Sequence, residues 1–160
     1  MYRKILLAYD GTLEGAIALR EGAILAKLCA ADVFILSVAP DASGLQIAEG
    51  VVGGAVSQHL ERYRDVLERG VARLTAFGMK PVARLAVGDP ARAIGAFAAE
   101  AGVDLVVVGH QRRRLLERWW SGSSGAYISD HIDCSLLIAR DAISDEEFER
   151  RMKAAAAPAS

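Results

Sequence analysis

Four consecutive apolar residues, Leu105 to Val108, read L-V-V-V, and three of them are β-branched. A strand of this composition has no polar face, so both of its faces must be covered. Helices packed on the two sides of a parallel sheet provide that cover. Gly109 follows directly and ends the run. The chain is therefore predicted to contain a parallel sheet with this run as one of its strands.

Further short apolar runs alternate with helical patterns along the chain. Such alternation is typical of an α/β fold in which right-handed crossovers join parallel strands. We predict an open, Rossmann-like parallel sheet of five strands with helices on both faces. The expected strands are Ile5–Ala8, Val33–Val38, Val82–Val87, Leu105–Val108 and Ser135–Ala139, and the expected helices are approximately 14–30, 57–78 and 91–101.

Turn and capping residues mark the helix ends. Ile17, Ile24 and Leu28 recur at helical spacing and should form the inner face of the first helix. Residues 40–56 are rich in Gly, Ala and Ser and predict a mobile loop, either a lid or a plain connection. We expect Thr12 and Asp89 as N-caps, Pro90 at the first helical position, and Gly78 and Gly102 as helix stops.

The composition limits the class of protein. A chain of 160 residues with net charge −1 fits one domain and shows no basic excess for nucleic acid or an acidic membrane surface. Cys29 and Cys134 are far apart and lie near apolar residues, which favours buried thiols in a reducing, cytoplasmic compartment. No apolar run approaches the roughly 20 residues that span a bilayer.

Several candidate ligand residues fall at the carboxyl ends of predicted strands. Asp10, Val38, Gly88-Asp89 and Gly109 each lie at or just past such an end. Open α/β sheets bind ligands at that edge, where the strand order reverses. The sequence therefore predicts a binding site there.

A second glycine-rich segment, Gly122-Ser123-Ser124-Gly125, precedes a predicted helix. Backbone N–H groups at the start of a helix can converge on an anion, with the helix dipole behind them. A plain loop followed by a serine N-cap accounts for the same residues. The residues alone leave both interpretations open.

The spacing of these motifs resembles the nucleotide-binding signature of the universal stress protein family, which reads G, two residues, G, nine residues, G-S/T. Here the positions are Gly109, Arg112 and Gly122-Ser123. The opening R-K-I-L-L-A-Y-D-G-T, the segment G-D-P-A-R-A-I from Gly88 and the late C-S-L-L-I-A-R are similar to other family landmarks. The likeness spans residues 1–140, which we expect to form the nucleotide-binding domain.

The resemblance implies a homodimer formed through the last strand, with ATP or AMP bound at the strand ends and Mg²⁺ accompanying a triphosphate. Asp10 would accept a hydrogen bond from the adenine or the ribose, and the backbone at Val38 would read the adenine edge. Gly109 would let the main chain approach the phosphates. The full set of implied binding residues is Ala8, Asp10, Val38, Gly109, Arg112, Gly122, Ser123 and Ser124.

Two of these positions have alternative roles. Asp10 could instead form an Asx-turn at the start of the first helix. Arg112 replaces the second glycine of the signature, and a long side chain weakens binding if a positive φ or a close approach is needed there. If the loop moves aside, its guanidinium could pair with phosphate oxygens. Around Cys134, Asp133 and Ser135 replace prolines common in the family.

The sequence favours a regulatory or signalling role over catalysis. No nucleophile and base are paired by spacing, and the dinucleotide and P-loop motifs are absent. ATP hydrolysis, if any, should be slow. The alternatives are a dimer that binds no nucleotide and acts through protein contacts and, further off, a phosphorylatable receiver-type domain with an aspartate after its first strand.

Residues 141–160 extend past the region of likeness. Ser144-Asp145-Glu146-Glu147 has the pattern of a capping box, and Phe148 and Met152 are one helical turn apart. We predict a short helix to about Lys153 whose apolar pair is available to a neighbour or partner, followed by a frayed tail.

Overall fold

The structure is a computed structural model that describes residues 1–41, 54–110, 128–140 and 142–156, without the side chains of residues 54–56. Five parallel strands form one sheet in the order β3-β2-β1-β4-β5. The strands are β1 (Lys4–Ala8), β2 (Asp32–Ala39), β3 (Val82–Val87), β4 (Leu105–Gly109) and β5 (Ser135–Ala139). All five were predicted from the sequence to within one residue at each end.

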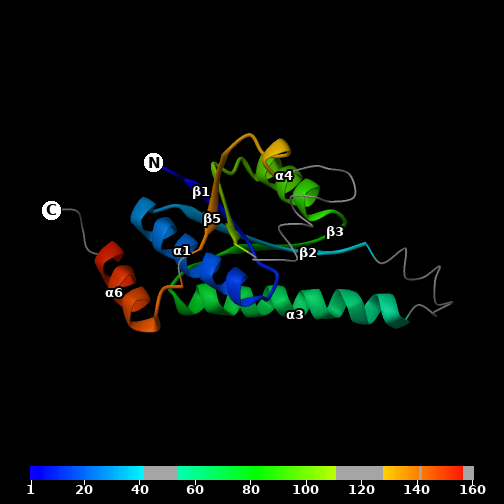
Figure 1. Cartoon of the computed structure of the whole chain (residues 1–160), viewed down its shortest axis with the longest axis horizontal. Helices are drawn as coiled ribbons and strands as arrows, with labels where there is room; N and C mark the ends of the chain where they lie inside the picture. The colour runs from blue at the N-terminus through cyan, green and yellow to red at the C-terminus, as the bar shows by residue number, and fades with distance from the viewer. Residues whose placement is uncertain (42–53, 111–127, 141, 157–160) are drawn as a thin grey trace.

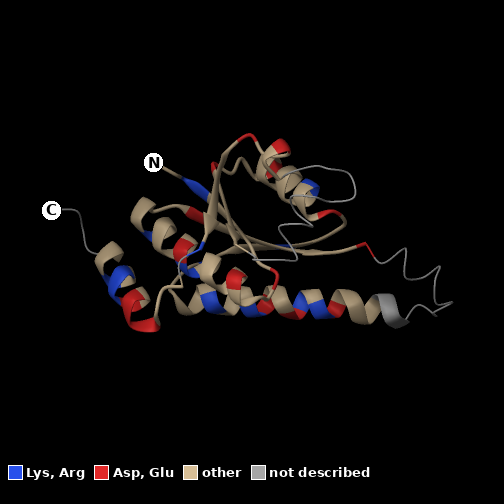
Figure 2. Cartoon of the chain, viewed as in Figure 1, with Lys and Arg blue, Asp and Glu red and all other residues tan. Residues whose placement is uncertain are grey.

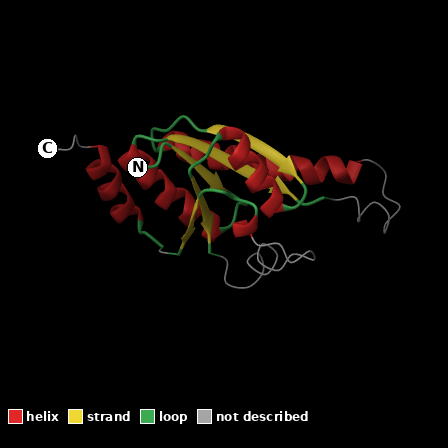
Figure 3. Ribbon diagram, turned by 90° about the horizontal axis from the view of Figure 1, so that it is seen from above, coloured by secondary structure: helices red, strands yellow, loops and turns green. Residues whose placement is uncertain are grey.

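Helices cover both faces of the sheet (Figures 1 and 3). One apolar core lies between the sheet and the helices α1, α3 and α6, and a second lies between the sheet and α4. The helices are α1 (Leu13–Cys29), α3 (Gly54–Ala76), α4 (Pro90–Ala101) and α6 (Asp145–Ala156), with a short 3-10 helix η1 (Ile128–Asp130). The predicted α/β architecture is confirmed.

The run that predicted a doubly covered strand is buried along its whole length. Leu105, Val106, Val107 and Val108 are at most 2% exposed. Their strand, β4, pairs with β1 on one side and β5 on the other. The lack of any polar face in this segment is therefore explained by helices above and below it and by strands on both sides.

The predicted caps are present. Thr12 Oγ1 accepts a hydrogen bond from the N–H of Gly15 at 3.1 Å and begins α1. Asp89 accepts one from the N–H of Arg92 at 3.0 Å, with Pro90 next to it, and begins α4. Gly102 ends α4 with a φ of 66°, a conformation that costs a glycine little. The crossovers are therefore set by local signals that the sequence carries.

One expectation about the helices was wrong, and another falls partly outside the described residues. Leu28, assigned to the inner face of α1, is 56% exposed, because it lies about 200° around the helix from the buried Ala26. The helix expected after Gly125 is, over the described residues, only the single 3-10 turn of η1. Residues 126 and 127 lie outside the described residues, and after η1 the chain passes His131, whose carbonyl packs closely on Gly95 of α4, and enters β5 at Ser135.

Charges of both signs are interspersed over the surface. Lys, Arg, Asp and Glu alternate along the outer side of α3 (Figure 2). No described helix combines the length and the apolar character needed to cross a membrane. Cys29 and Cys134 are free thiols, both partly exposed, and burial, followed by the nearby carboxylates Asp104 and Asp133, raises the pKa of Cys134.

The strand order also tests the receiver alternative. Receiver domains have the order 2-1-3-4-5, in which the third strand pairs with the first. Here β1 pairs with β2 and β4, and β3 lies at an edge beside β2. The receiver alternative is therefore wrong.

Candidate functional site

The strand order reverses between β1 and β4. From β1 the chain proceeds outward to β2 and β3, and it then returns to β4 and β5 on the other side of β1. At such a point the two connecting chains leave in opposite directions, which opens a crevice outside the carboxyl ends of the strands. The sequence placed its candidate residues at this edge.

A cavity of about 210 Å³ lies at this edge, above the carboxyl ends of β1 and β2. It reaches across the top of the sheet, because its lining comes from α3 on one face and α4 on the other. Ala8, Asp10 and Val38, three of the predicted binding residues, line it. The other lining residues are Tyr9, Thr12, Leu36, Pro40, Tyr63, Pro90 and Ile94.

Asp10 links this cavity to the start of α1. Its Oδ1 accepts hydrogen bonds from the N–H of Thr12 at 3.0 Å and from Thr12 Oγ1 at 2.5 Å. The local Asx-turn foreseen as an alternative is therefore present, but the direct cap of α1 is Thr12. Asp10 orients that cap and at the same time lines the cavity. Its hydrogen bonds to Thr12 therefore do not remove it from the cavity.

The end of β2 is held against β1 by a group that the sequence analysis missed. Ser37 is completely buried, and its Oγ donates a hydrogen bond to the carbonyl of Tyr9 at 2.7 Å. The N–H of Tyr9 donates to the carbonyl of Leu36 at 2.9 Å. These bonds place Val38 beside Asp10, and a serine within an otherwise apolar strand was the only signal for them.

Gly109 lies where β4 meets the first turn of α1. A Cβ at this position would lie 2.4 Å from the carbonyl oxygen of Glu14 and 2.9 Å from the backbone nitrogen of Gly15. Real Cβ atoms do not approach so closely, so any side chain would push α1 away from the sheet. Close packing of α1 on β4 therefore accounts for this glycine, in addition to the predicted approach of the main chain to phosphate.

The remaining predicted residues, Arg112, Gly122, Ser123 and Ser124, lie outside the described residues. The structure thus brings together Ala8, Asp10 and Val38. The phosphate-binding loop stays a prediction. Over the described chain, no three His, Cys, Asp or Glu side chains are grouped as metal ligands.

Beside Gly109, the exits of β4 and β5 carry a polar pair. The guanidinium of Arg140 donates to Nε2 of His110 at 3.1 Å, and the N–H of His110 donates to the carbonyl of Ala139 at 2.9 Å. The sequence analysis did not single out either residue for the site. Their contact places the positive charge of Arg140 at the carboxyl ends of the strands, where the cavity also lies.

The sequence profile of the Universal stress protein family matches residues 1–140. The chain belongs to the universal stress protein family. Its curated relatives include a universal stress protein of Bacillus subtilis, 29% identical over 88% of this chain and all of the relative. Another, from Synechocystis, is 27% identical over 87% of this chain and 98% of the relative.

Solved structures of the family share the fold. One from Burkholderia pseudomallei matches with a TM-score of 0.64 and 26% identity, covering 86% of this chain and 95% of its own. A universal stress protein in complex with cAMP matches with a TM-score of 0.63 and 22% identity, covering 86% and 96%. An Arabidopsis thaliana family protein with AMP bound matches with a TM-score of 0.60 and 14% identity, covering 90% and 94%.

Proposed function

We propose that this universal stress protein binds an adenine nucleotide, ATP or AMP, as a regulatory or signalling ligand and acts as a cytoplasmic homodimer. The observation that carries the proposal is the cavity at the strand ends, which Ala8, Asp10 and Val38 line together. All three are among the binding residues that the family resemblance implies, and Asp10 and Val38 are the ones for which it implies contacts to adenosine. Structural neighbours that hold cAMP and AMP support the class of ligand.

The size of the cavity agrees with one end of a nucleotide. Sites for whole drug-sized ligands occupy about 300–1,000 Å³. At about 210 Å³ this cavity suits a base with part of its ribose. The phosphates would extend along the sheet edge toward Gly109 and the segment with Arg112, Gly122, Ser123 and Ser124. In this arrangement Arg112 pairs with phosphate oxygens, and Mg²⁺ enters with ATP.

The free edge of the sheet at β5 supports the homodimer. Leu136, Leu137 and Ile138 are partly exposed, although each packs in part against one of the two cores. An apolar edge strand with unpaired backbone groups favours pairing with a second strand. A two-fold related copy satisfies this edge without open-ended assembly.

Calorimetric titration tests the ligand. Nucleotide-free protein is titrated with ATP and with AMP in the presence of Mg²⁺, and the variants Gly122→Val and Asp10→Ala are compared with wild type. We expect saturable binding by wild type, loss of binding in Gly122→Val, and weaker binding in Asp10→Ala. Arg69→Ala, on the exposed side of α3, is the control and should bind like wild type.

Absence of heat and of competition with a labelled nucleotide, for wild-type protein shown to be folded, would overturn the proposal. That result would favour the alternative of a dimer that acts through protein contacts, for which Arg112 in the signature is the sequence argument. If wild type binds, Arg112→Gly decides the role of the arginine: weaker binding means that the guanidinium contacts phosphate, and tighter binding means that it obstructs.

A further inference from the structure

Helix α3 contributes an aromatic side chain to the cavity. Tyr63 is partly buried and lines the cavity opposite Pro90 and Ile94 of α4. Tyr63 shares the side of α3 that carries the buried Val66, Leu67 and Leu74, and it was not among the predicted binding residues. In the structure the N-terminal end of α3 runs past the ends of the other helices (Figure 1), and the first buried α3 residue of the core is Val66, which follows Tyr63 by about one turn.

A neighbouring histidine fixes the position of this tyrosine. His59 precedes Tyr63 by one helical turn, and the two rings meet edge to face with centroids 5.2 Å apart. The Nε2–H of His59 donates to the carbonyl of Pro40, which follows β2, at 3.3 Å. Tyr63 is thereby tied through His59 to the strand end that carries Val38.

The other aromatic residue of the lining is not free to meet a ligand. Tyr9 is 4% exposed and belongs to the core between the sheet and α3. Its ring packs so closely on α3 that a Cβ on Gly70 would lie 2.7 Å from it. Tyr63 is therefore the aromatic side chain of this lining that can present its ring to a bound molecule.

We propose that Tyr63 contacts the base of the bound nucleotide and makes the cavity selective for a flat purine ring, with His59 as its positioning residue. The proposal rests on the proposed function, because it needs a nucleotide in this cavity. Bases stack favourably on aromatic side chains, and replacing such a side chain weakens binding. The remaining lining is aliphatic or small and polar, so no other described residue supplies this contact.

The test compares Tyr63→Phe and Tyr63→Leu with wild type, using AMP and CMP as ligands. Tyr63→Phe keeps the ring and should retain the affinity for AMP. Tyr63→Leu keeps apolar volume without a π-face, and we expect about tenfold weaker AMP binding and a smaller preference for AMP over CMP. In nuclear magnetic resonance spectra, adenine H2 and H8 should move upfield with wild type and Tyr63→Phe, and move less with Tyr63→Leu.

His59 is tested by conservative rescue. His59→Ala should reduce the preference for AMP over CMP, whereas His59→Gln, whose side-chain amide can donate to Pro40, should restore part of it. Arg69→Ala is again the control on the same helix.

The outcomes separate the two proposals. If wild type binds neither AMP nor ATP, the proposed function fails and this inference fails with it. If wild type binds AMP and Tyr63→Leu binds it equally well with the same preference over CMP, nucleotide binding stands and the assignment of Tyr63 is overturned. Loss of the AMP preference and of the upfield shifts in folded Tyr63→Leu supports the assignment.

Discussion

Single residues at the strand ends serve packing and the cavity together. Gly109 is required because the backbone of α1 passes where a side chain would begin, and Asp10 holds the cap of α1 while it lines the cavity. A sequence motif reports only that such residues are present. Since Asp10 and Gly109 have packing roles as well as proposed binding roles, a substitution that weakens binding must also be checked for folding.

At the amino ends of the strands, opposite the cavity, Asp104 joins the starts of β4 and β1. Its carboxylate accepts hydrogen bonds from the N–H groups of Arg3 at 2.8 Å and Lys4 at 3.1 Å. Burial alone raises the pKa of Asp104, but these bonds outweigh it, and the pKa lies below its usual value of 3.8. A lowered pKa in the folded state means that the carboxylate stabilises the fold above pH 3.8 and ceases to do so as the pH falls through its folded pKa.

We therefore predict that Asp104→Asn lowers the free energy of unfolding at pH 7 by about 1–2 kcal/mol. The reason is that the N–H groups of Arg3 and Lys4 would no longer donate to a charged carboxylate. The difference from wild type should shrink as the pH falls below 3.8 and passes through the folded pKa of Asp104. Urea denaturation at pH 7 and at a series of pH values below 3.8 measures this difference, with the exposed Asp133→Asn as control. A deficit that keeps its pH 7 value throughout this acid series would contradict the argument.

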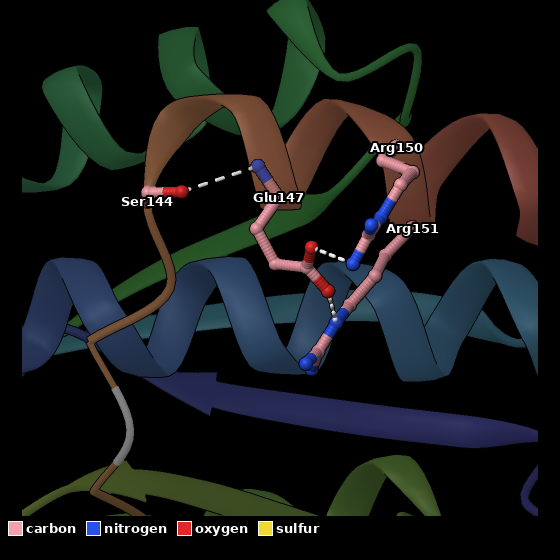
Figure 4. Close-up of polar contacts among 4 residues, drawn as sticks. All are labelled: Ser144, Glu147, Arg150 and Arg151. Carbon is pink, nitrogen blue, oxygen red and sulfur yellow. Dashed lines mark hydrogen bonds and ion pairs between the residues drawn. The ribbon is translucent and has the colours of Figure 1, made fainter.

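At the scale of elements, α6 shows how a local signal and a tertiary contact combine. Ser144 Oγ accepts a hydrogen bond from the N–H of Glu147 at 3.2 Å, as the capping-box pattern predicted (Figure 4). The Glu147 carboxylate does not complete the box but pairs with Arg150 and Arg151 (Figure 4). The hydrogen bond from Arg151 is the largest of the interactions that hold the pKa of Glu147 below its usual value.

The apolar side of α6 packs on the chain's own helices. Phe148 is 5% exposed, and its ring centroid is 4.4 Å from that of Phe77, which follows α3. Arg20 of α1 donates to the carbonyl of Ile143 at 2.8 Å and forms an ion pair with Asp145. We had expected Phe148 and Met152 to face a neighbour or partner, but both are buried in the chain's own core. The domain boundary at residue 140 stays a prediction.

Removing the Phe148 ring should show whether α6 contributes to the stability of the whole domain. We predict that Phe148→Ala lowers the free energy of unfolding by about 3 kcal/mol, at the lower end for a buried phenylalanine because α6 lies at the periphery. Glu149→Ala, on the exposed side of the same helix, should change it by less than about 0.5 kcal/mol. Urea denaturation with hydrogen exchange of α6 measures both, and equal values for the two variants would show that docking adds nothing.

At the scale of the whole molecule, the two edges of the sheet differ and give the dimer a direct test. Leu137 lies on edge strand β5, and Val82 lies on the opposite edge strand β3, where it is 56% exposed. We predict that Leu137→Lys weakens the proposed homodimer more than about tenfold, because burying an unpaired ammonium costs several kcal/mol. Sedimentation equilibrium measures the dissociation constant, with circular dichroism to check folding.

Val82→Lys is the matched control for that experiment and should leave the dimer unchanged. Dissociation by Val82→Lys, with Leu137→Lys still dimeric, would move the interface to the β3 edge. A monomeric wild-type protein at all concentrations would contradict the homodimer itself.

The sequence by itself determined the elements, because strand runs, caps and stops act over a few residues. The β-branched run at Leu105, the caps at Thr12 and Asp89, and the stop at Gly102 each depend on nearest neighbours along the chain. The candidate residues at the carboxyl ends of the predicted strands indicated where a site would lie, and the family motifs added the proposed class of ligand.

Only the tertiary structure decided how distant segments meet. The order β3-β2-β1-β4-β5, the buried Ser37 bond between β1 and β2, the close approach of α1 to Gly109 and the place of Tyr63 in the cavity all join residues far apart in sequence. A period of 3.6 residues assigns Tyr63 to the inner side of α3, but it does not report where the sheet ends beneath the helix. Whether that side chain packs in a core or borders a cavity depends on the length of α3 relative to the sheet, which is a property of the assembled fold.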